Sequence, residues 1–124
     1  MAGELILIVE DNEKNLKLVR DVLQAKGYTT VEAGTGEDGV RLAKERHPAL
    51  VLMDIQLPGI DGITALGQLR ADAATRAIPV IAVTASAMTQ DRQKIMAAGF
   101  DGYQSKPIRV KEFLDAVRVM LDRT

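Results

Sequence analysis

The chain has 124 residues, 47% of them hydrophobic and 27% charged, which fits one globular domain over residues 1–124 with a single core. Its formal net charge of -1 argues against a nucleic-acid-binding protein, and its lack of cysteine excludes disulfides, thiolate metal sites and a cysteine nucleophile. No apolar run approaches the roughly 20 residues of a membrane span and no signal-peptide pattern opens the sequence, so we expect a cytoplasmic protein without membrane contact.

Apolar segments of strand length alternate with segments of helical period along the chain. The predicted strands cover residues 5–9, 28–32, 49–53, 78–83 and 102–104. The clearest helical pattern lies near the C-terminus, at Val110, Phe113, Leu114, Val117, Met120 and Leu121. This alternation predicts an α/β protein with a parallel sheet that helices cover on both faces.

Three of the predicted strands, at 5–9, 49–53 and 78–83, are apolar throughout, as buried central strands of a parallel sheet are. The segment at 28–32 is half polar and fits an edge strand. In an open α/β sheet, ligands bind beyond the carboxyl ends of the strands, near the point where the strand order reverses. The candidate functional residues are therefore those that directly follow each strand.

Three carboxylates, a hydroxyl and an ammonium group follow the predicted strands, on Glu10, Asp11, Asp54, Thr84 and Lys106. Each has an ordinary structural interpretation by itself. Acidic residues favour the first turn of a helix, aspartate favours turns, threonine caps helices, and most lysines are solvated. Together, however, like charges that converge at one sheet edge repel each other unless a cation joins them.

The candidate ligands are carboxylates without histidine or cysteine, which favours a hard cation such as Mg²⁺. Mg²⁺ held in this way usually serves a phosphoryl group, which a threonine hydroxyl and a lysine ammonium can also contact. Neither glycine-rich nucleotide-binding motif occurs, so we expect no bound nucleotide. The economical alternative is covalent attachment of the phosphoryl group to a carboxylate, and Asp54 is the best candidate because it is central.

Four motifs resemble those of a known family: IVEDN at 8–12, LMDIQLPGIDG at 52–62, AVTASAM at 82–88 and SKPI at 105–108. In this order and spacing the chain resembles the receiver domain of bacterial response regulators over essentially its whole length, and most of all single-domain regulators of the DivK or chemotaxis type. The resemblance implies a flavodoxin-like (βα)5 sandwich with a parallel sheet in the strand order 2-1-3-4-5. It also implies a phosphorylation-dependent signalling switch of a two-component system or phosphorelay.

In such a switch, Asp54 accepts a phosphoryl group from a phosphohistidine on a sensor histidine kinase or a histidine phosphotransfer protein. The chain's own histidine, His47, has the ordinary interpretation of a helix-end or loop residue, so a partner has to supply the donor. The resemblance implies Mg²⁺, with Mn²⁺ as a substitute. Its protein ligands would be Glu10, Asp11, Asp54 and the backbone carbonyl of Gln56. The protein would be a phosphoacceptor rather than an enzyme, although it would catalyse its own phosphoryl transfer and slow autodephosphorylation.

By the same resemblance, Thr84 and Lys106 would contact the phosphoryl group, and the peptide bond Lys106-Pro107 would be cis. Thr84 would also act as a switch together with Tyr103, whose alternative interpretation is an aromatic residue packed at the sheet edge. Segment 85–99 carries few large apolar residues, and a lightly anchored helix there suits a two-state output surface.

The resemblance further implies two partner surfaces. A downstream protein target would bind the fourth helix, the last strand and the last helix, at residues that include Met88, Ile95 and Gln104. The donor would dock around Asp54, at residues that include Asn15, Leu16 and Ile108. We expect a monomer or a weak dimer that binds no nucleic acid.

Other interpretations stay open at this point. The chain can also be a receiver domain from a hybrid histidine kinase or a multidomain regulator, or a scaffold of the same fold that is never phosphorylated. All five types of site residue are present, which disfavours the scaffold. An aspartyl-phosphate hydrolase of the haloacid dehalogenase type would require aspartate in place of Gln56. A flavodoxin-like cofactor carrier would require a phosphate-binding loop and flanking aromatic residues.

Overall fold

Strands and helices alternate regularly in the computed structural model, which describes residues 3–85 and 89–123, with residues 89–91 described by their backbone. The strands are β1 Leu5–Val9, β2 Thr29–Ala33, β3 Leu50–Asp54, β4 Val80–Thr84 and β5 Gly102–Ser105. The helices are α1 Glu13–Ala25, α2 Gly36–Arg46, α3 Gly62–Ala71, α4 Thr89–Ala97 and α5 Val110–Asp122.

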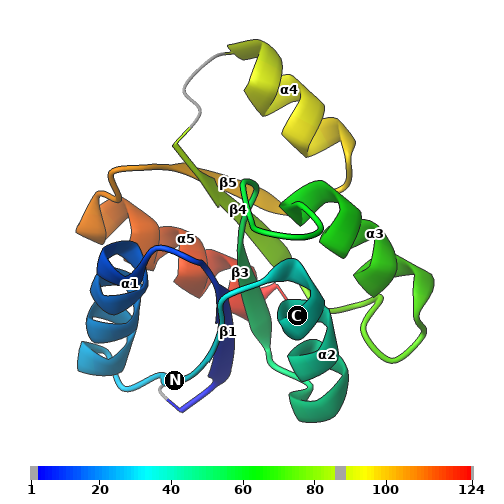
Figure 1. Cartoon of the computed structure of the whole chain (residues 1–124). Coiled ribbons are helices and arrows are strands. Elements are labelled where there is room, and N and C mark those ends of the chain that lie inside the picture. Colours follow the sequence, from blue (N-terminus) through cyan, green and yellow to red (C-terminus); the bar gives the residue numbers. More distant parts are fainter. Residues whose placement is uncertain (1–2, 86–88, 124) are drawn as a thin grey trace.

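The strands form one parallel sheet in the order β2-β1-β3-β4-β5. Helices α1 and α5 lie on one side of the sheet, and α2, α3 and α4 lie on the other (Figure 1). This is the flavodoxin-like architecture that the sequence predicts. The chain runs outward from β1 to β2 and returns past β1 to β3, so the strand order reverses between β1 and β3. A binding site is expected at the carboxyl ends of these two strands.

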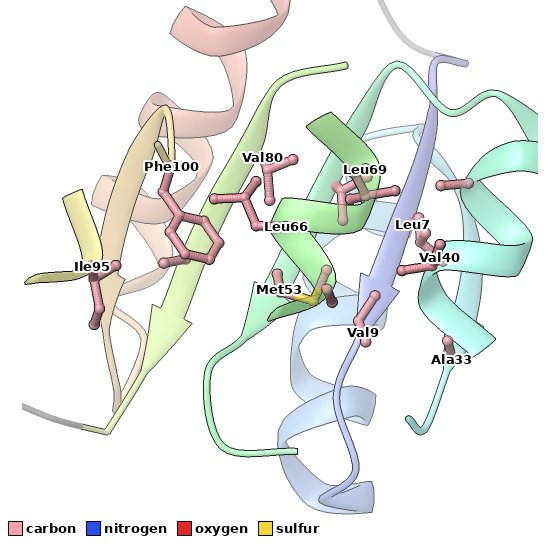
Figure 2. Packing of buried hydrophobic residues seen from close by; sticks show 14 residues of the cluster. Leu7, Val9, Ala33, Val40, Met53, Leu66, Leu69, Val80, Ile95 and Phe100 are labelled. Carbon is pink, nitrogen blue, oxygen red and sulfur yellow. The ribbon is translucent and has the colours of Figure 1, made fainter. Parts of the chain in front are cut away.

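Apolar side chains bury the sheet on both faces, in two clusters that we call α3-side and α5-side after the helices that cover them. The α3-side cluster, shown in Figure 2, includes Leu7, Val9, Val51, Met53, Leu66, Leu69, Val80 and Ile95. The α5-side cluster includes Ile6, Ile8, Leu50, Leu52, Val83, Phe113 and Val117. Successive residues of a strand point to opposite faces, so the continuous apolar run at 50–53 is what a strand buried on both faces requires.

The strand ends differ from their predicted positions by one or two residues. β3 and β4 extend one residue further than predicted, so Asp54 and Thr84 are the last residues of these strands. β4 also begins at Val80 instead of Ile78, because Pro79 has no amide hydrogen to donate to a neighbouring strand. Two of the candidate functional residues are therefore part of the sheet itself.

Helix α4 corrects one prediction. Ile95 is 3% exposed and packs in the α3-side cluster together with Phe100, so the prediction that Ile95 belongs to a partner surface is wrong. The physical reason is that α4 needs an apolar anchor, and Ile95 is the buried residue among 92–97. Its neighbour Met96 is 40% exposed. Met88, another predicted residue of that surface, lies outside the described residues.

Helix α3 begins with an aspartate cap close to the strand ends. The side chain of Asp61 accepts a hydrogen bond from the amide of Thr64 at 2.8 Å. This bond satisfies one of the free amide donors of the first helical turn. It also lowers the pKa of the Asp61 carboxyl below its ordinary value of 3.8.

We expect Asp61→Ala to lower the free energy of unfolding by about 1 kcal/mol at neutral pH, because α3 loses its cap. Since the folded-state pKa is depressed, this contribution is present above the unfolded-state pKa and is lost as the pH falls through the folded-state value. Urea denaturation should therefore show a difference between wild type and variant that shrinks in acid. Asp61→Asn keeps an acceptor oxygen and is the control. Equal stability of wild type and Asp61→Ala at neutral pH would contradict the capping role.

Candidate functional site

The candidate residues meet at one edge of the sheet. Glu10 directly follows β1, Asp54 and Thr84 end β3 and β4, and Lys106 directly follows β5. The parallel register brings these strand ends level with one another. Glu10, Asp54 and Thr84 are 4%, 6% and 1% exposed. Buried polar groups require hydrogen-bonding or charged partners, which their neighbours at this edge have to supply.

The ammonium group of Lys106 bridges two of the carboxylates. Its Nζ atom lies 2.5 Å from Glu10 Oε1 and 2.9 Å from Asp54 Oδ2. Burial acts to lower the pKa of Lys106, but the hydrogen bonds to Glu10 and Asp54 outweigh this effect and the pKa is raised. The ammonium therefore stays charged at neutral pH, and charge-assisted hydrogen bonds of this kind are short and strong.

The other carboxylate oxygen of Glu10 connects the site to helix α1. It accepts a hydrogen bond from the amide of Asn12 at 3.1 Å, and Asn12 Oδ1 in turn caps α1 through the amides of Lys14 and Asn15. Burial raises the pKa of Glu10, and the hydrogen bonds from Lys106 and Asn12 offset this effect only in part. A buried carboxylate that its partners compensate only in part favours a further cation nearby.

Three carboxylates are placed to hold that cation. Oxygen atoms of Glu10, Asp11 and Asp54 lie within 4.8 Å of one another. Asp11 is exposed and the other two are buried, so the group opens to solvent on one side. Mg²⁺ takes oxygen ligands, keeps several waters and usually binds proteins through one or two carboxylates. The residues present therefore fit the predicted cation.

The loop after β3 places the backbone of Gln56 beside Asp54. The amide of Gln56 donates to Asp54 Oδ1 at 3.2 Å, and the amide of Gly62 donates to the carbonyl of Ile55 at 2.9 Å. A Cβ atom at Gly62 would lie 2.3 Å from the carbonyl oxygen of Asp54, so glycine is needed for α3 to begin this close to the strand. The sequence patterns did not single out Gly62. The available signal was a glycine directly after the capping aspartate of α3.

Both predicted switch residues adjoin helix α4. Thr84 lines a pocket of about 210 Å³ whose other lining residues include Lys94 and Ile95 of α4. Tyr103 of β5 is half-buried against the α3-side cluster, and the guanidinium carbon of Arg92 lies 5.2 Å from the centre of its ring. This distance is that of a cation–π contact between α4 and β5.

The remaining predicted residues lie around these strand ends. The peptide bond Lys106-Pro107 is cis, as predicted. Leu16 on α1 and Ile108 after β5 are half-buried and pack against the α5-side cluster, so the two predicted docking segments lie on the same side of the sheet. Asn15 on α1 and Gln104 in β5 are half-buried as well.

The fold, the acidic edge and the lysine that follows the last strand define a receiver-type phosphotransfer domain. The sequence profile of the response regulator receiver domain matches residues 6–118 of the chain. The chain belongs to this family.

Among curated proteins, the polar-differentiation response regulators DivK of Brucella ovis and Brucella abortus are 47% identical over 116 residues, which is 94% of this chain and of each relative. Among solved structures, the receiver domain of a sensor histidine kinase from Pseudomonas aeruginosa is 34% identical, with a TM-score of 0.91 over 98% of this chain and 99% of that one. That structure has a magnesium ion coordinated in its active-site cleft. A receiver domain protein from Methanospirillum hungatei is 28% identical, with a TM-score of 0.86 over 98% of this chain and 96% of that one.

Membership in this family makes phosphotransfer signalling in a two-component system the general function of the chain. Receiver domains typically interact with histidine kinases or phosphotransfer proteins. Within the described residues, no helix is both long and apolar enough to cross a bilayer.

We expect Lys106→Met to lower the free energy of unfolding by roughly 3 kcal/mol in the absence of Mg²⁺, because it leaves Glu10 and Asp54 buried without their cation. Removing one carboxylate as well, in Lys106→Met with Asp54→Asn, should recover part of the loss. Urea denaturation of wild type, both single variants and the double variant measures this coupling.

The matched control for this experiment is Lys17→Met. Lys17 is an exposed lysine whose partner, Asp21, is also exposed. Exposed ion pairs contribute little, so its removal should leave stability nearly unchanged. If Lys106→Met were as stable as Lys17→Met, the buried bridge would not have the role assigned to it.

Proposed function

We propose that the chain is a phosphorylation-dependent switch whose acceptor residue is Asp54. The observation that carries this proposal is the buried Asp54 carboxylate, which lies 2.9 Å from the Lys106 ammonium. Carboxylate oxygens of Glu10 and Asp11 complete a group within 4.8 Å. The donor would be a phosphohistidine on a sensor histidine kinase or a histidine phosphotransfer protein.

Mg²⁺ would be held by Glu10, Asp11, Asp54 and the backbone carbonyl of Gln56, with Mn²⁺ as a substitute. When bound, the ion supplies positive charge that neutralises and orients the oxygens of the phosphoryl group. The magnesium ion in the 34% identical Pseudomonas aeruginosa domain supports this assignment.

In the transfer step, a carboxylate oxygen of Asp54 forms a bond to phosphorus. The bond from phosphorus to the donor's imidazole nitrogen breaks, and the imidazole keeps that electron pair. The Gln56 amide and the Lys106 ammonium hold the Asp54 carboxylate in position for this attack. Lys106 then pairs with one oxygen of the transferred group, and the Thr84 hydroxyl donates a hydrogen bond to another.

The chain therefore supplies position and charge to its own phosphorylation and acts as a phosphoacceptor rather than an enzyme with a separate substrate. Attack of water on phosphorus reverses the modification. The oxygen–phosphorus bond breaks, phosphate leaves and the Asp54 carboxylate is restored. The same Lys106 and Thr84 contacts that stabilise the transferring phosphoryl group would also stabilise it during this slow autodephosphorylation.

The phosphorylated state would be read on the surface of α4, β5 and α5 by a downstream protein target. Three observations support this part of the proposal. Ile95 is the buried anchor of α4 among residues 92–97, and Arg92 of α4 contacts the ring of Tyr103. The pocket of about 210 Å³ beside Thr84 leaves room for side chains to rearrange. A helix whose described side chains at 92–97 include one buried residue can shift at small cost in packing.

A free-standing regulator and a receiver module of a larger histidine kinase are both candidates for this function. Identity of 47% to DivK over 94% of each chain favours a free-standing regulator. We further propose that this regulator is a cytoplasmic monomer or weak dimer. The 34% identical Pseudomonas aeruginosa domain, which belongs to a sensor histidine kinase, favours a module. Both candidates use the same site chemistry and differ in whether the phosphohistidine donor lies on the same polypeptide.

We expect intact-mass spectrometry to show the gain of one phosphoryl group after incubation with acetyl phosphate and Mg²⁺. Asp54→Ala should show no gain, and chelation of the metal should abolish it in the wild type. Lys106→Met should slow the reaction roughly 100-fold, because a charge that stabilises the transferring group is lost. Asp21→Asn, which removes an exposed carboxylate far along α1, is the control and should react like wild type. No gain in the wild type would refute Asp54 as the acceptor.

We expect Mg²⁺ and beryllium fluoride, which mimics a phosphoryl group on aspartate, to shift the amide resonances of α4 and β5 in NMR spectra. Tyr103→Ala should strongly reduce the shifts in α4, because the ring that contacts Arg92 is gone. Tyr103→Phe keeps the ring and should respond like wild type. The Gln56 amide should respond in all three proteins, which shows that the mimic has bound. Unchanged α4 shifts in Tyr103→Ala would rule out the switch role.

A further inference from the structure

The loop after β3, residues 55–61, is pressed against the first turn of α2. A Cβ atom at Gly36 would lie 2.7 Å from Cγ1 and from the carbonyl oxygen of Ile60. A Cβ atom at Gly59 would lie 2.5 Å from Oε2 and 2.6 Å from Oε1 of Glu37, and Gly59 has a φ of +76°. A side chain at either position would separate helix and loop, so the two glycines allow a direct contact between segments more than twenty residues apart.

The Glu37 carboxylate is the polar part of this contact. It covers Gly59, and its Oε1 accepts a hydrogen bond from the amide of Ile60 at 3.4 Å. Glu37 lies in the first turn of α2, which Thr35 caps, and a carboxylate is favourable at that end of a helix. Helix α2 is itself fixed to the sheet, since a Cβ atom at Gly39 would lie 2.8 Å from the Val9 side chain.

The same loop is tied to the functional site at its start, and its two ends are joined to each other. At its start, the Gln56 amide donates to Asp54 Oδ1 at 3.2 Å. At its end, the Gly62 amide donates to the Ile55 carbonyl at 2.9 Å. Between these points the loop turns through Pro58 and Gly59, where it contacts the exposed side chain of Glu37 of α2, and its Leu57 and Ile60 side chains pack against the α3-side cluster.

We propose that Glu37 is a positioning residue for the metal site, which acts from α2 by fixing the loop that carries the Gln56 carbonyl. This inference rests on the proposed function, in which that carbonyl is a Mg²⁺ ligand. Glu37 itself is not a ligand. Mg²⁺ demands near-ideal octahedral geometry, so a loop that samples several positions binds it more weakly than a loop held in one.

The test compares Glu37→Ala with Glu37→Gln. Both variants remove the same negative charge, but the glutamine side chain keeps an oxygen that can accept the Ile60 hydrogen bond. Any difference between them therefore reports the contact and not the long-range electrostatic effect on a cation. Mg²⁺ titrations followed by two-dimensional NMR give the dissociation constant and the amide resonances of Gln56 and Ile60 in each protein. Glu45→Ala, at the exposed other end of α2, is the control.

Glu37→Ala should raise the Mg²⁺ dissociation constant about threefold to tenfold relative to Glu37→Gln, the range expected for one hydrogen bond and its ordering of a loop. The Ile60 amide resonance should move in Glu37→Ala and return toward its wild-type position in Glu37→Gln. Saturating Mg²⁺ should restore the rate of phosphorylation by acetyl phosphate in Glu37→Ala, because the loss is one of metal affinity. Glu45→Ala should match wild type in every measurement.

Equal Mg²⁺ affinity of Glu37→Ala and Glu37→Gln, with wild-type binding intact, would overturn the role of Glu37 and leave the proposed function standing. Absence of Mg²⁺ binding by the wild-type chain would overturn the proposed metal site, and the role of Glu37 with it. The two failures are therefore distinguishable in one set of titrations.

Discussion

The bridge from the Lys106 ammonium to the buried carboxylates of Glu10 and Asp54 is the interaction on which the rest of the site depends. A parallel sheet brings the ends of β1 and β3 together, and in this chain each of those ends carries acidic residues. The positive charge of the Lys106 ammonium offsets one of the three carboxylate charges of Glu10, Asp11 and Asp54, so two negative charges remain. A divalent cation would neutralise them, and the added charge of a phosphoryl group would then be tolerated only beside that cation and the lysine. The charge balance of the edge thus favours both the metal and the modification.

The apolar strands make this charge arrangement possible. β1 and β3 are buried on both faces, so their ends cannot move apart without disrupting both clusters of the core. Carboxylates on flexible loops would relieve their repulsion by separating. Held at the end of a rigid strand or directly after one, they keep that repulsion until a cation binds, which is the condition for a preorganised site. The long apolar run that ends in Asp54 therefore has a functional reason as well as a packing reason.

Much of this arrangement could be predicted from local sequence because it follows from strand-end positions. Continuous apolar runs indicate central parallel strands, and the residues after such strands have to meet at one edge. The prediction for Ile95 was wrong because α4 has a weak apolar pattern, and a weak pattern does not show which residue anchors the helix. The contacts of Glu37 with Gly59 and of Gly62 with the Asp54 carbonyl were not predictable, since they join segments whose approach depends on the packed fold. The start of β4 was predicted too early because Ile78, before Pro79, is as apolar as the strand itself. Pro79 has no amide hydrogen to donate to a neighbouring strand, so β4 begins only at Val80.

The two sides of the site are held differently, and the proposed switch needs both. The loop after β3 is held at Gln56, at Ile60 and at Gly62, which suits a metal ligand that has to keep its geometry. Toward α4, Thr84 ends a rigid strand but adjoins a pocket of about 210 Å³, which the loop after β3 also lines, and a helix whose buried residue among 92–97 is Ile95. If both sides were rigid, phosphorylation would change the charge of the site without moving a surface. If both were loose, the metal would bind poorly and the modification would be slow. In the proposed switch, a fixed metal side and a movable phosphoryl side would let one local change in charge be converted into a change of shape at α4.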